Sequence, residues 1–511
     1  MNGYELAAFI VYFALVIGVG VFFFMKSRKN GGEKEYFLGG RNMSGPVAAL
    51  SAGASDMSAW VLMGLPGAIY ALGLGQLWIS IGLAIGTVLA WIFVAPRLRT
   101  FSMKANDSIT IPQFLTNRFK SKNKILQVVC AVVFIVAYTV YAASSISACG
   151  NLFTTVFHIE NPLLPMIIAA AIIIIYTFLG GFNAVCWTDF FQGLLMLAAL
   201  MAAPIVGMFA IKAEGFVPMS EVNMGENYFN ILSSGSFDKA SLIDILSGIA
   251  WGFGYFGMPH ILIRYMSIRS KKEMKRSRVI GSAWTILILA ATSVVAIVGR
   301  KYIGDALLVV MEDGGDRRSE IFIELVRSLF PALLSGILLS AILAASMSTA
   351  DSQLLASSSA FASDVYKPIF RKNASDKEML WAGRFVVILI AIAALLIAIN
   401  PNSGGIMDLV SNAWGFFGAA FGPTIILSLY WKRFNYIGAV AGIITGFTVD
   451  VLWLFVVPNE AFGGFGGVYE LFPGFIIGFL VCVIVTLVTK APSKEVQQLF
   501  DDAVAFTKNE E

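Results

Sequence analysis

The sequence predicts an all-α polytopic membrane protein, built as two inverted five-helix repeats around two broken helices. Of the 511 residues, 58% are hydrophobic and only 13% are charged, whereas about one quarter of the residues in a soluble domain are charged. Apolar runs of roughly 20 residues, the length that crosses a bilayer as a helix, recur along the chain. Two of these runs contain Gly and Pro in corresponding positions, which is typical of an inverted repeat.

Thirteen runs qualify as membrane-spanning helices. They lie at 4–25, 45–70, 77–95, 125–153, 163–180, 187–211, 242–264, 279–299, 332–362, 382–399, 406–430, 437–457 and 471–489. Spans two to six and seven to eleven form the two repeats. Because each repeat has an odd number of spans, the repeats have opposite topology, and the remaining three spans are peripheral.

This pattern divides the chain into five parts. They are a first helix with its cytoplasmic loop (1–44), a first repeat with an external loop (45–241), a second repeat (242–431), two peripheral helices (432–490) and a cytoplasmic tail (491–511). The tail is short and weakly amphipathic, and we expect no regulatory domain in it.

Positive charges set the orientation. Clusters of Lys and Arg follow the first, third, seventh, ninth, eleventh and thirteenth spans, and with thirteen spans all these loops lie on one face. The positive-inside rule makes that face cytoplasmic, so the N-terminus is outside and the C-terminus inside. The opposite loop at 300–331 is predicted to contain short external helices, although any long loop over a packed bundle has a similar composition.

The composition disfavours several functions. The four cysteines lie singly in apolar runs, and two histidines with no His-Glu-x-x-His pattern do not make a metal centre. The net charge of +4 is confined to short loops, which argues against nucleic acid as a partner. The N-terminus lacks a basic region and a cleavage site, so we expect a retained first span rather than a removed signal peptide.

The stretch at 51–60 is central to the prediction. Asp56 lies there inside a spanning run, flanked by the hydroxyls of Ser51, Ser55 and Ser58 and followed by helix breakers at 64–67. An ionisable group at membrane depth costs about 3 kcal/mol unless it faces protein, water or a partner ion. We therefore expect a discontinuous helix that holds a cation and a solute. The alternative is a packing helix in which Asp56 only caps a neighbour.

Three signatures together resemble the sodium/solute symporter family, and within it the bacterial sodium/proline symporters. They are the stretch at 51–60, the segment at 180–193 between spans five and six, and the segment at 344–353 in span nine. The similarity runs from about residue 1 to residue 490. It implies a LeuT-type fold of thirteen helices that couples inward sodium movement to solute uptake at the plasma membrane.

The resemblance also implies a sodium site between the break in span two and the middle of span nine. Its ligands are the carbonyls of Ala54, Met57 and Ala345, the hydroxyls of Ser348 and Thr349, and the carboxylate of Asp56 as an essential charge. Oxygen ligands suit a hard cation, and a broken helix frees carbonyls. Alternatively, the two hydroxyls bond to their own helical turn, which is their commoner behaviour.

Two further residues match family positions on the sodium exit route, Asp189 and Arg41. For Asp189 the alternative is a helix cap formed by Asp189 or Thr188. For Arg41 it is one more positive charge on the cytoplasmic side.

The solute site is expected one layer outward of the ion. Proline has a carboxylate, a secondary ammonium and a compact ring, which suit helix N-terminal amides, oxygens and aromatic faces respectively. The matching residues are Ser58, Trp60, Gly64, Tyr141, Trp251, Tyr255 and Pro259. Interfacial anchoring is the alternative role for the Trp and Tyr residues.

We therefore expect a sodium symporter whose solute is L-proline, with sodium and membrane lipid as its other partners and no obligate protein partner. A symporter for another amino acid, a carboxylate or pantothenate is the alternative. An ion channel is more distant because repeated pore segments are not found in the sequence. An intramembrane enzyme is disfavoured because a positioned base or metal is lacking.

Overall fold

The computed structural model describes residues 2–27, 33–159, 161–179, 181–213, 226–309 and 317–510. In this part of the chain the regular structure is helical apart from one isolated parallel bridge between Met43 and Ile268. Part of the predicted external loop at 212–241 and residues 310–316 of the second external loop lie outside the described residues.

The helices follow the predicted apolar runs closely. Their bounds are α1 (Gly3–Ser27), α2 (Glu33–Leu38), α3 (Gly45–Asp56), α4 (Gly64–Leu72), α5 (Leu77–Leu89), α6 (Ala95–Lys104), α7 (Ile111–Arg118), α8 (Ile125–Phe157), α9 (Leu163–Leu179), α10 (Phe182–Ala213), α11 (Lys239–Ala250), α12 (Pro259–Ser267), α13 (Lys271–Ile303), α14 (Ile321–Leu329), α15 (Ala332–Ala360), α16 (Asp376–Ala398), α17 (Ile406–Tyr430), α18 (Tyr436–Phe455), α19 (Leu471–Val488) and α20 (Lys494–Glu510). Short 3-10 and π segments join several of them.

Ten helices of the described chain are long and apolar enough to cross a membrane. The protein is therefore an all-helical polytopic membrane protein, as the sequence predicts. The other three predicted spans correspond to α9, which has 17 residues, and to the two interrupted segments α3–α4 and α11–α12. The short external helices predicted at 300–331 are present as α14 and a 3-10 turn before it.

Polar caps start several helices where a loop enters the bundle. Ser270, Ser375 and Asn435 precede α13, α16 and α18, and each side-chain oxygen accepts a hydrogen bond from a backbone amide of the first turn. Such caps satisfy amides that have no partner within the helix. The helix starts are therefore encoded locally in the loops.

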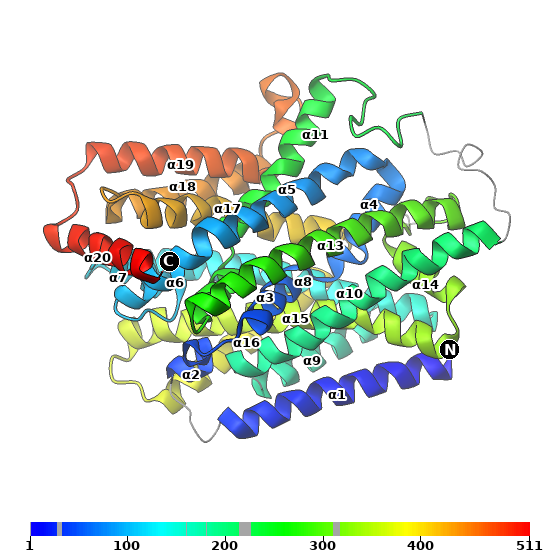
Figure 1. The fold of residues 1–511 in the computed structure, drawn as a ribbon, viewed down its shortest axis with the longest axis horizontal. Helices are drawn as coiled ribbons and strands as arrows, with labels where there is room; N and C mark the ends of the chain where they lie inside the picture. Colours follow the sequence, from blue (N-terminus) through cyan, green and yellow to red (C-terminus); the bar gives the residue numbers. More distant parts are fainter. Residues whose placement is uncertain are drawn as a thin grey trace.

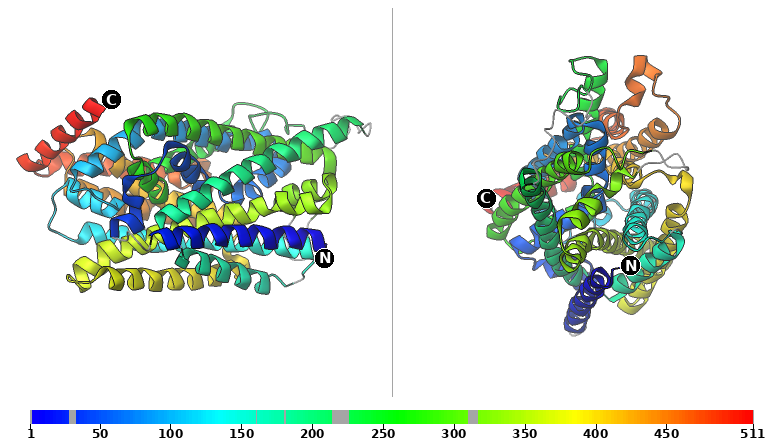
Figure 2. Two further views of the ribbon diagram at one scale, coloured as in Figure 1. Left: turned by 60° about the horizontal axis from the view of Figure 1, so that its bottom comes forward. Right: turned by 90° about the vertical axis from the view of Figure 1, so that its right-hand side faces the viewer.

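The helices lie side by side in one bundle, and the two termini lie at its opposite ends (Figures 1 and 2). The helices α2, α6, α7, α20 and the start of α13 gather at one end, on the left of Figure 1. Nine Lys and Arg residues of the predicted cytoplasmic clusters belong to α6, α7, α20 and the start of α13. The arrangement therefore fits a topology in which the termini are on opposite sides of the membrane.

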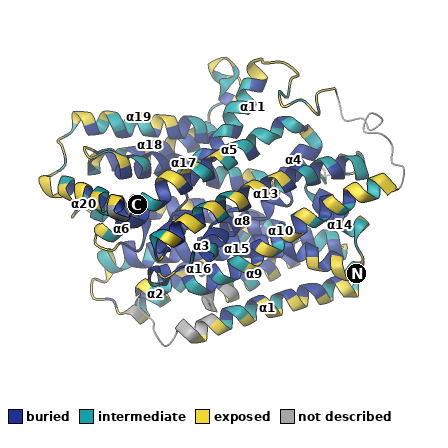
Figure 3. Ribbon diagram, viewed as in Figure 1, coloured by how far each residue is buried: buried dark blue, intermediate teal, exposed yellow. Residues whose placement is uncertain are grey.

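The centre of the bundle is formed by α3, α8, α15 and α17, which are mostly buried, whereas α1, α16 and α19 expose apolar side chains outward (Figure 3). Every residue of α15 from Leu338 to Ala360 is buried. This helix is rich in Ser and Ala, and small side chains let neighbouring membrane helices approach closely. The predicted ligands of span nine thus lie in the core.

Candidate functional site

The first break, residues 57–63, separates α3 from α4. The helix α3 ends at Asp56, and Met57 and Ser58 leave the helical region with ψ values of 71° and −169°. The Ser58 hydroxyl accepts a 3.5 Å hydrogen bond from the Trp60 amide, which caps a short 3-10 turn. Pro66 lies in the first turn of α4, where proline is tolerated because its missing amide has no helical partner. The interruption predicted from the sequence is confirmed.

The second break, residues 251–258, separates α11 from α12. It consists of a 3-10 segment from Trp251 to Phe256 and an extended Met258, after which Pro259 starts α12 at the position that proline favours. Glycines are needed here for close packing. A Cβ on Gly254 would lie 2.1 Å from Trp414 Nε1, and one on Gly257 would lie 2.5 Å from the carbonyl oxygen of Phe417.

Oxygen atoms from α3 and α15 converge next to the first break. The Ser348 hydroxyl donates to the carbonyl of Ala54 at 2.8 Å and to the carbonyl of Ala345 at 3.1 Å. The Thr349 hydroxyl donates to the same Ala54 carbonyl at 3.5 Å. Ser348 therefore bonds both to its own turn and across to α3. Ala54, Ala345, Ser348 and Thr349 thus meet in one buried cluster of oxygens, and Met57 is the buried first residue after α3.

Asp56 lies at the end of α3 and connects the two breaks. Its side chain is 1% exposed, and Oδ2 accepts a hydrogen bond from the Tyr255 hydroxyl at 2.5 Å. Oδ1 is buried without a hydrogen-bond partner among the described residues. A buried carboxylate oxygen with no partner is costly, so a cation beside it would be stabilising. The structure thus provides both neutral oxygens and one negative charge at the first break.

Aromatic rings lie directly over this polar cluster. Trp60 and Trp251 approach with ring centroids 5.9 Å apart, and Trp251 stacks on Tyr469 at 5.1 Å. The Tyr141 hydroxyl donates to the Asp56 carbonyl at 3.1 Å, and the Trp60 indole donates to the same carbonyl at 3.2 Å. Aromatic faces of this kind suit a compact ring and an ammonium group.

The other two predicted solute residues flank this cluster. Gly64 is the first residue of α4, and a Cβ at Gly64 would lie 3.6 Å from the Cβ of Trp60. Pro259 is buried at the start of α12, on the far side of the second break from Trp251. The side chains of Trp60, Tyr141, Trp251 and Tyr255 are all buried, so the region is closed to solvent in this conformation.

Asp189 belongs to a second polar network one helical turn from the sodium ligands. Its Oδ2 lies 3.1 Å from Arg264 Nη2 and accepts a 2.6 Å hydrogen bond from Ser51 on α3. Arg264 also donates to Ser352 on α15 at 2.5 Å. The helix-cap alternative for Asp189 and Thr188 is wrong, because α10 already begins at Phe182 and Thr188 bonds to its own helix.

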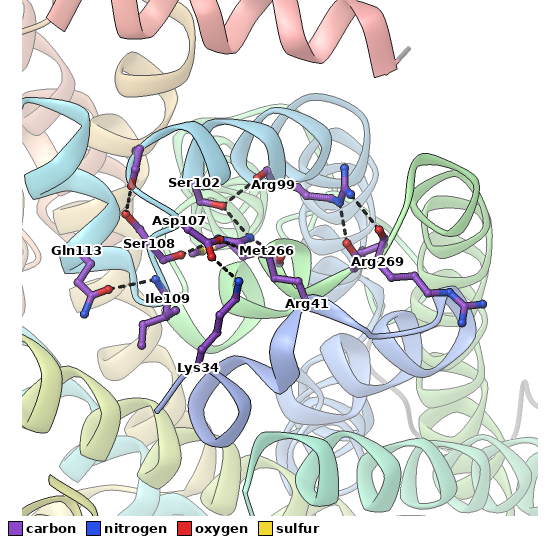
Figure 4. Close-up of polar contacts among 12 residues, drawn as sticks. Lys34, Arg41, Arg99, Ser102, Asp107, Ser108, Ile109, Gln113, Met266 and Arg269 are labelled. Atoms are coloured by element: carbon purple, nitrogen blue, oxygen red, sulfur yellow. Dashed lines mark hydrogen bonds and ion pairs between the residues drawn. The ribbon is translucent and has the colours of Figure 1, made fainter. Parts of the chain in front are cut away.

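Arg41 is buried in the 3-10 turn before α3, where it joins three segments (Figure 4). Its guanidinium donates to Asp107 Oδ1 at 2.8 Å, to the Ser102 hydroxyl at 3.0 Å, and to the carbonyls of Ser108 and Met266, each at 2.7 Å. Burial lowers the pKa of Arg41, and the Asp107 charge opposes that shift. These contacts tie α3 to the α6–α7 loop and to the end of α12.

The carboxyl of Asp107 is held in its charged form by the same cluster. Partial burial raises the pKa of Asp107, but hydrogen bonds and charges from Lys34 and Arg41 outweigh it, so the pKa lies below its usual value. We call Lys34, Arg41, Ser102, Asp107 and Ser108 the inner clasp.

Three residues of this region escaped the sequence analysis. Arg264 counted only as a loop charge, although it is 2% exposed and pairs with Asp189. Trp414 and Tyr469 belong to α17 and to the residues before α19, and both contact Trp251. A Trp in the middle of a span with Gly at 415, 418 and 422 was the available signal for Trp414.

Comparison with known proteins adds to this geometry. The model of the Sodium:solute symporter family matches residues 36–446. The high-affinity proline transporter PutP of Bacillus subtilis (strain 168) is 42% identical over 468 residues, which cover 92% of this chain and 95% of that protein. The sodium/proline symporter of Escherichia coli (strain K12) is 41% identical over 502 residues, which cover 98% of this chain and 96% of that protein.

A solved structure of a sodium-coupled sialic acid symporter, in a substrate-bound outward-open state, has the same fold. The TM-score is 0.75 with 21% sequence identity, and the match covers 96% of this chain and 99% of that one. The helix arrangement described above is thus shared by a known sodium-coupled transporter.

Proposed function

The chain belongs to the sodium:solute symporter family, and from its site and its relatives we propose that it takes up L-proline together with sodium by alternating access. It is a multi-pass transporter of the bacterial plasma membrane, not an enzyme. The observation that carries the proposal is the oxygen cluster at the first break, where Ser348, Thr349 and the Ala54 carbonyl meet below an aromatic layer.

Sodium binds, in this proposal, to the carbonyls of Ala54, Met57 and Ala345 and the hydroxyls of Ser348 and Thr349. Neutral oxygen ligands from two helices suit a hard monovalent cation that must leave again. Asp56 supplies the negative charge. Its bond to Tyr255 links that charge to the second break, so sodium binding at α3 would order the solute side as well.

Proline, in this proposal, binds among Trp60, Tyr141, Trp251 and Tyr255 when the region opens. The first break supplies amides at the start of α4 for its carboxylate, since helix N-termini favour negative charge. The indole rings of Trp60 and Trp251 would cover the pyrrolidine ring and its ammonium. Ser58 and Gly64 line the same break, and Pro259 fixes where α12 begins.

Sodium release follows the network around Asp189 in this proposal. Ser51 and Ser352 lie on the same two helices as the sodium ligands, one turn further toward the basic end of the bundle. The Arg264–Asp189 pair would close this path, and the inner clasp at Arg41 would close the protein below it.

The finer topology is also part of the proposal. Thirteen spans, with α3–α4 and α11–α12 each counted as one, place the N-terminus outside and the C-terminus inside. Spans two to six and seven to eleven would be the inverted repeats, in domains 45–241 and 242–431, with domains 1–44, 432–490 and 491–511 around them. The similarity of fold to the sialic acid symporter supports this reading.

The energetics allow strong accumulation. If one sodium enters with one zwitterionic proline, one positive charge moves inward, and a potential of about 100 mV contributes roughly 2.3 kcal/mol. A roughly tenfold sodium gradient adds about 1.4 kcal/mol. Together they set a ceiling of roughly 500-fold accumulation, enough to scavenge a dilute nutrient.

Uptake into proteoliposomes tests the function. Labelled proline should accumulate only with an imposed inward sodium gradient, saturably and with an inward current. Unlabelled proline should compete, whereas alanine, glucose and pantothenate should not. If proline neither competes nor evokes a sodium-dependent current, the solute is a different small organic molecule. Uptake that does not saturate would instead indicate a channel.

A further inference from the structure

A cavity of about 530 Å³ opens at the basic end of the bundle, away from the two breaks. It lies between α6, the start of α13, the end of α17 and the C-terminal helix α20, which are neighbours in Figures 1 and 2. A hydrogen bond of 2.6 Å between the Thr100 and Thr507 hydroxyls closes it on the side of α20. In the proposed orientation this end of the bundle faces the cytoplasm.

Five cationic side chains line the cavity, and none of its lining residues is acidic. They are Arg97, Arg99, Lys271, Lys275 and Arg278. The two arginines of α6 are fixed by backbone carbonyls, Arg97 by Leu429 at 2.7 Å and Arg99 by Ile268 at 2.6 Å. Both arginine side chains are therefore held at the cavity by backbone carbonyls.

The described residues provide no carboxylate partner for the three cations on α13. The only carboxylate in the first two turns of α13, Glu273, pairs with Arg269 and Arg276, which are not among the residues lining the cavity. Among the described residues, no carboxylate forms an ion pair with Lys271, Lys275 or Arg278. The Nε of Arg278 is buried without a hydrogen-bond partner there. The cavity therefore concentrates uncompensated positive charge, which attracts an anion.

Exposed apolar side chains also line the cavity, next to the cations. Ile92 and Phe93 are 38% and 49% exposed, and Tyr430 is 42% exposed. Next along α13, Val279 is 68% exposed, so the apolar lining continues onto the outer surface of the bundle that faces lipid. A ligand that fits both parts of the lining has an anionic head and an apolar tail.

We propose that this cavity binds the headgroup of one anionic phospholipid of the cytoplasmic leaflet, with its phosphate among the cations of α6 and α13 and its acyl chains along Ile92 and Phe93. Basic pockets between membrane helices on the cytoplasmic side have this preference. The inference rests on the proposed orientation and not on the proposed solute. Through Thr507 the bound lipid would also hold α20 against the bundle.

Native mass spectrometry of the full-length transporter tests the proposal. The protein in detergent is titrated with phosphatidylglycerol or phosphatidylcholine of identical acyl chains. One phosphatidylglycerol molecule should be retained at concentrations where phosphatidylcholine is not, and higher salt should weaken its binding. Equal retention of the two lipids would overturn the proposal. Soluble glycerol phosphate should not displace the lipid, and if it does, the cavity is a site for free phosphate compounds instead.

The variant K271Q/K275Q/R278Q removes the three cations that α13 contributes to the cavity and leaves Arg97 and Arg99 in place. Because each cation near an anionic lipid surface contributes about fivefold, phosphatidylglycerol should bind roughly a hundredfold more weakly. The matched control is K122Q/K124Q/K272Q, which removes three other cations from the same end of the bundle. Equal loss in both variants, or no loss in the first, would overturn the proposal. The comparison of the two lipids on the unmodified protein stands even if a variant fails to fold.

Discussion

The two breaks interrupt their helices in chemically different ways. The first break is polar: α3 ends on a buried carboxylate, and two hydroxyls of α15 donate to the Ala54 carbonyl near that end. The second break is aromatic and glycine-rich: Trp251 and Tyr255 project from a 3-10 segment whose glycines pack against Trp414 and the α17 backbone. The difference fits the proposed function, in which the cation binds at the first break and the solute ring packs against the second.

One hydrogen bond crosses between the two regions. The Tyr255 hydroxyl of the second break donates to Asp56 of the first at 2.5 Å. Coupled transport requires that binding of one ligand change the affinity for the other, which is a coupling free energy between two sites. In this structure the Tyr255–Asp56 hydrogen bond joins the two regions, beside the ring contact between Trp60 and Trp251.

The largest effect is expected for D56N. The amide keeps the shape of the side chain but removes the charge beside the cation. Breaking a buried charge pair costs about 3–5 kcal/mol, so the sodium concentration for half-maximal uptake should rise more than a hundredfold. Sodium activation curves in proteoliposomes measure this.

The control for this variant is D450N. Asp450 is also fully buried and its carboxylate has no hydrogen-bond partner among the described residues, but it lies on the peripheral helix α18. D450N should keep normal sodium activation. If D56N and D450N change sodium activation equally, the charge of Asp56 has no specific role in cation binding.

The next effect is expected for S348A/T349A. Each substitution removes one neutral oxygen ligand, and each loss weakens sodium binding by about 1 kcal/mol. The sodium concentration for half-maximal uptake should therefore rise roughly 25-fold in the double variant. S340A is the matched control, because Ser340 lies on the same helix and donates only to the Gly336 carbonyl of its own turn. Unchanged sodium activation in S348A/T349A would show that neither residue is a sodium ligand.

A smaller effect is expected for Y255F, which removes the hydrogen bond between the breaks. A hydrogen bond to a charged group contributes about 1.5 kcal/mol. The sodium concentration and the proline concentration that give half-maximal uptake should therefore both rise about tenfold. Y70F is the control, because Tyr70 donates to the backbone carbonyl of Gly304, outside both breaks. If Y255F changes only the proline affinity, this contact does not couple the two ligands.

The smallest effect concerns the inner clasp and its pH dependence. Because the pKa of Asp107 is lower in the folded protein than its ordinary value, the clasp stabilises the protein above the ordinary carboxylate pKa of about 3.9. That stabilisation is lost as the pH falls through the lowered value. D107N should reduce Tm by roughly 1–2 °C, since the carboxylate is half exposed. The reduction should be the same at pH 6 and pH 8 and should disappear only in strong acid.

Much of this architecture could be predicted from the sequence, because a bilayer imposes length and apolarity on each span. The bounds of α17 were predicted correctly, and Gly and Pro marked both interrupted helices. Asp56 could be singled out from the sequence because an ionisable group inside a membrane span carries a large free-energy cost. The family resemblance, not the local pattern, selected the ligands in span nine.

The remaining features depend on packing between distant segments. Arg264 is adjacent to a basic loop in sequence, and only the fold turns it inward to pair with Asp189 on α10. Likewise, Tyr469 contacts Trp251 across more than 200 residues. The inner clasp joins α3 to the α6–α7 loop and α12, and no spacing rule relates those three segments.

The most direct test of the division between the two breaks is equilibrium binding of ²²Na⁺ to the purified transporter without proline. S348A/T349A should bind sodium roughly 25-fold more weakly than the unmodified protein. In contrast, W251F, which changes only the second break, should bind sodium normally while its proline affinity falls. If W251F loses sodium affinity as severely as S348A/T349A, or if S348A/T349A binds sodium normally, the cation does not bind at the first break as proposed.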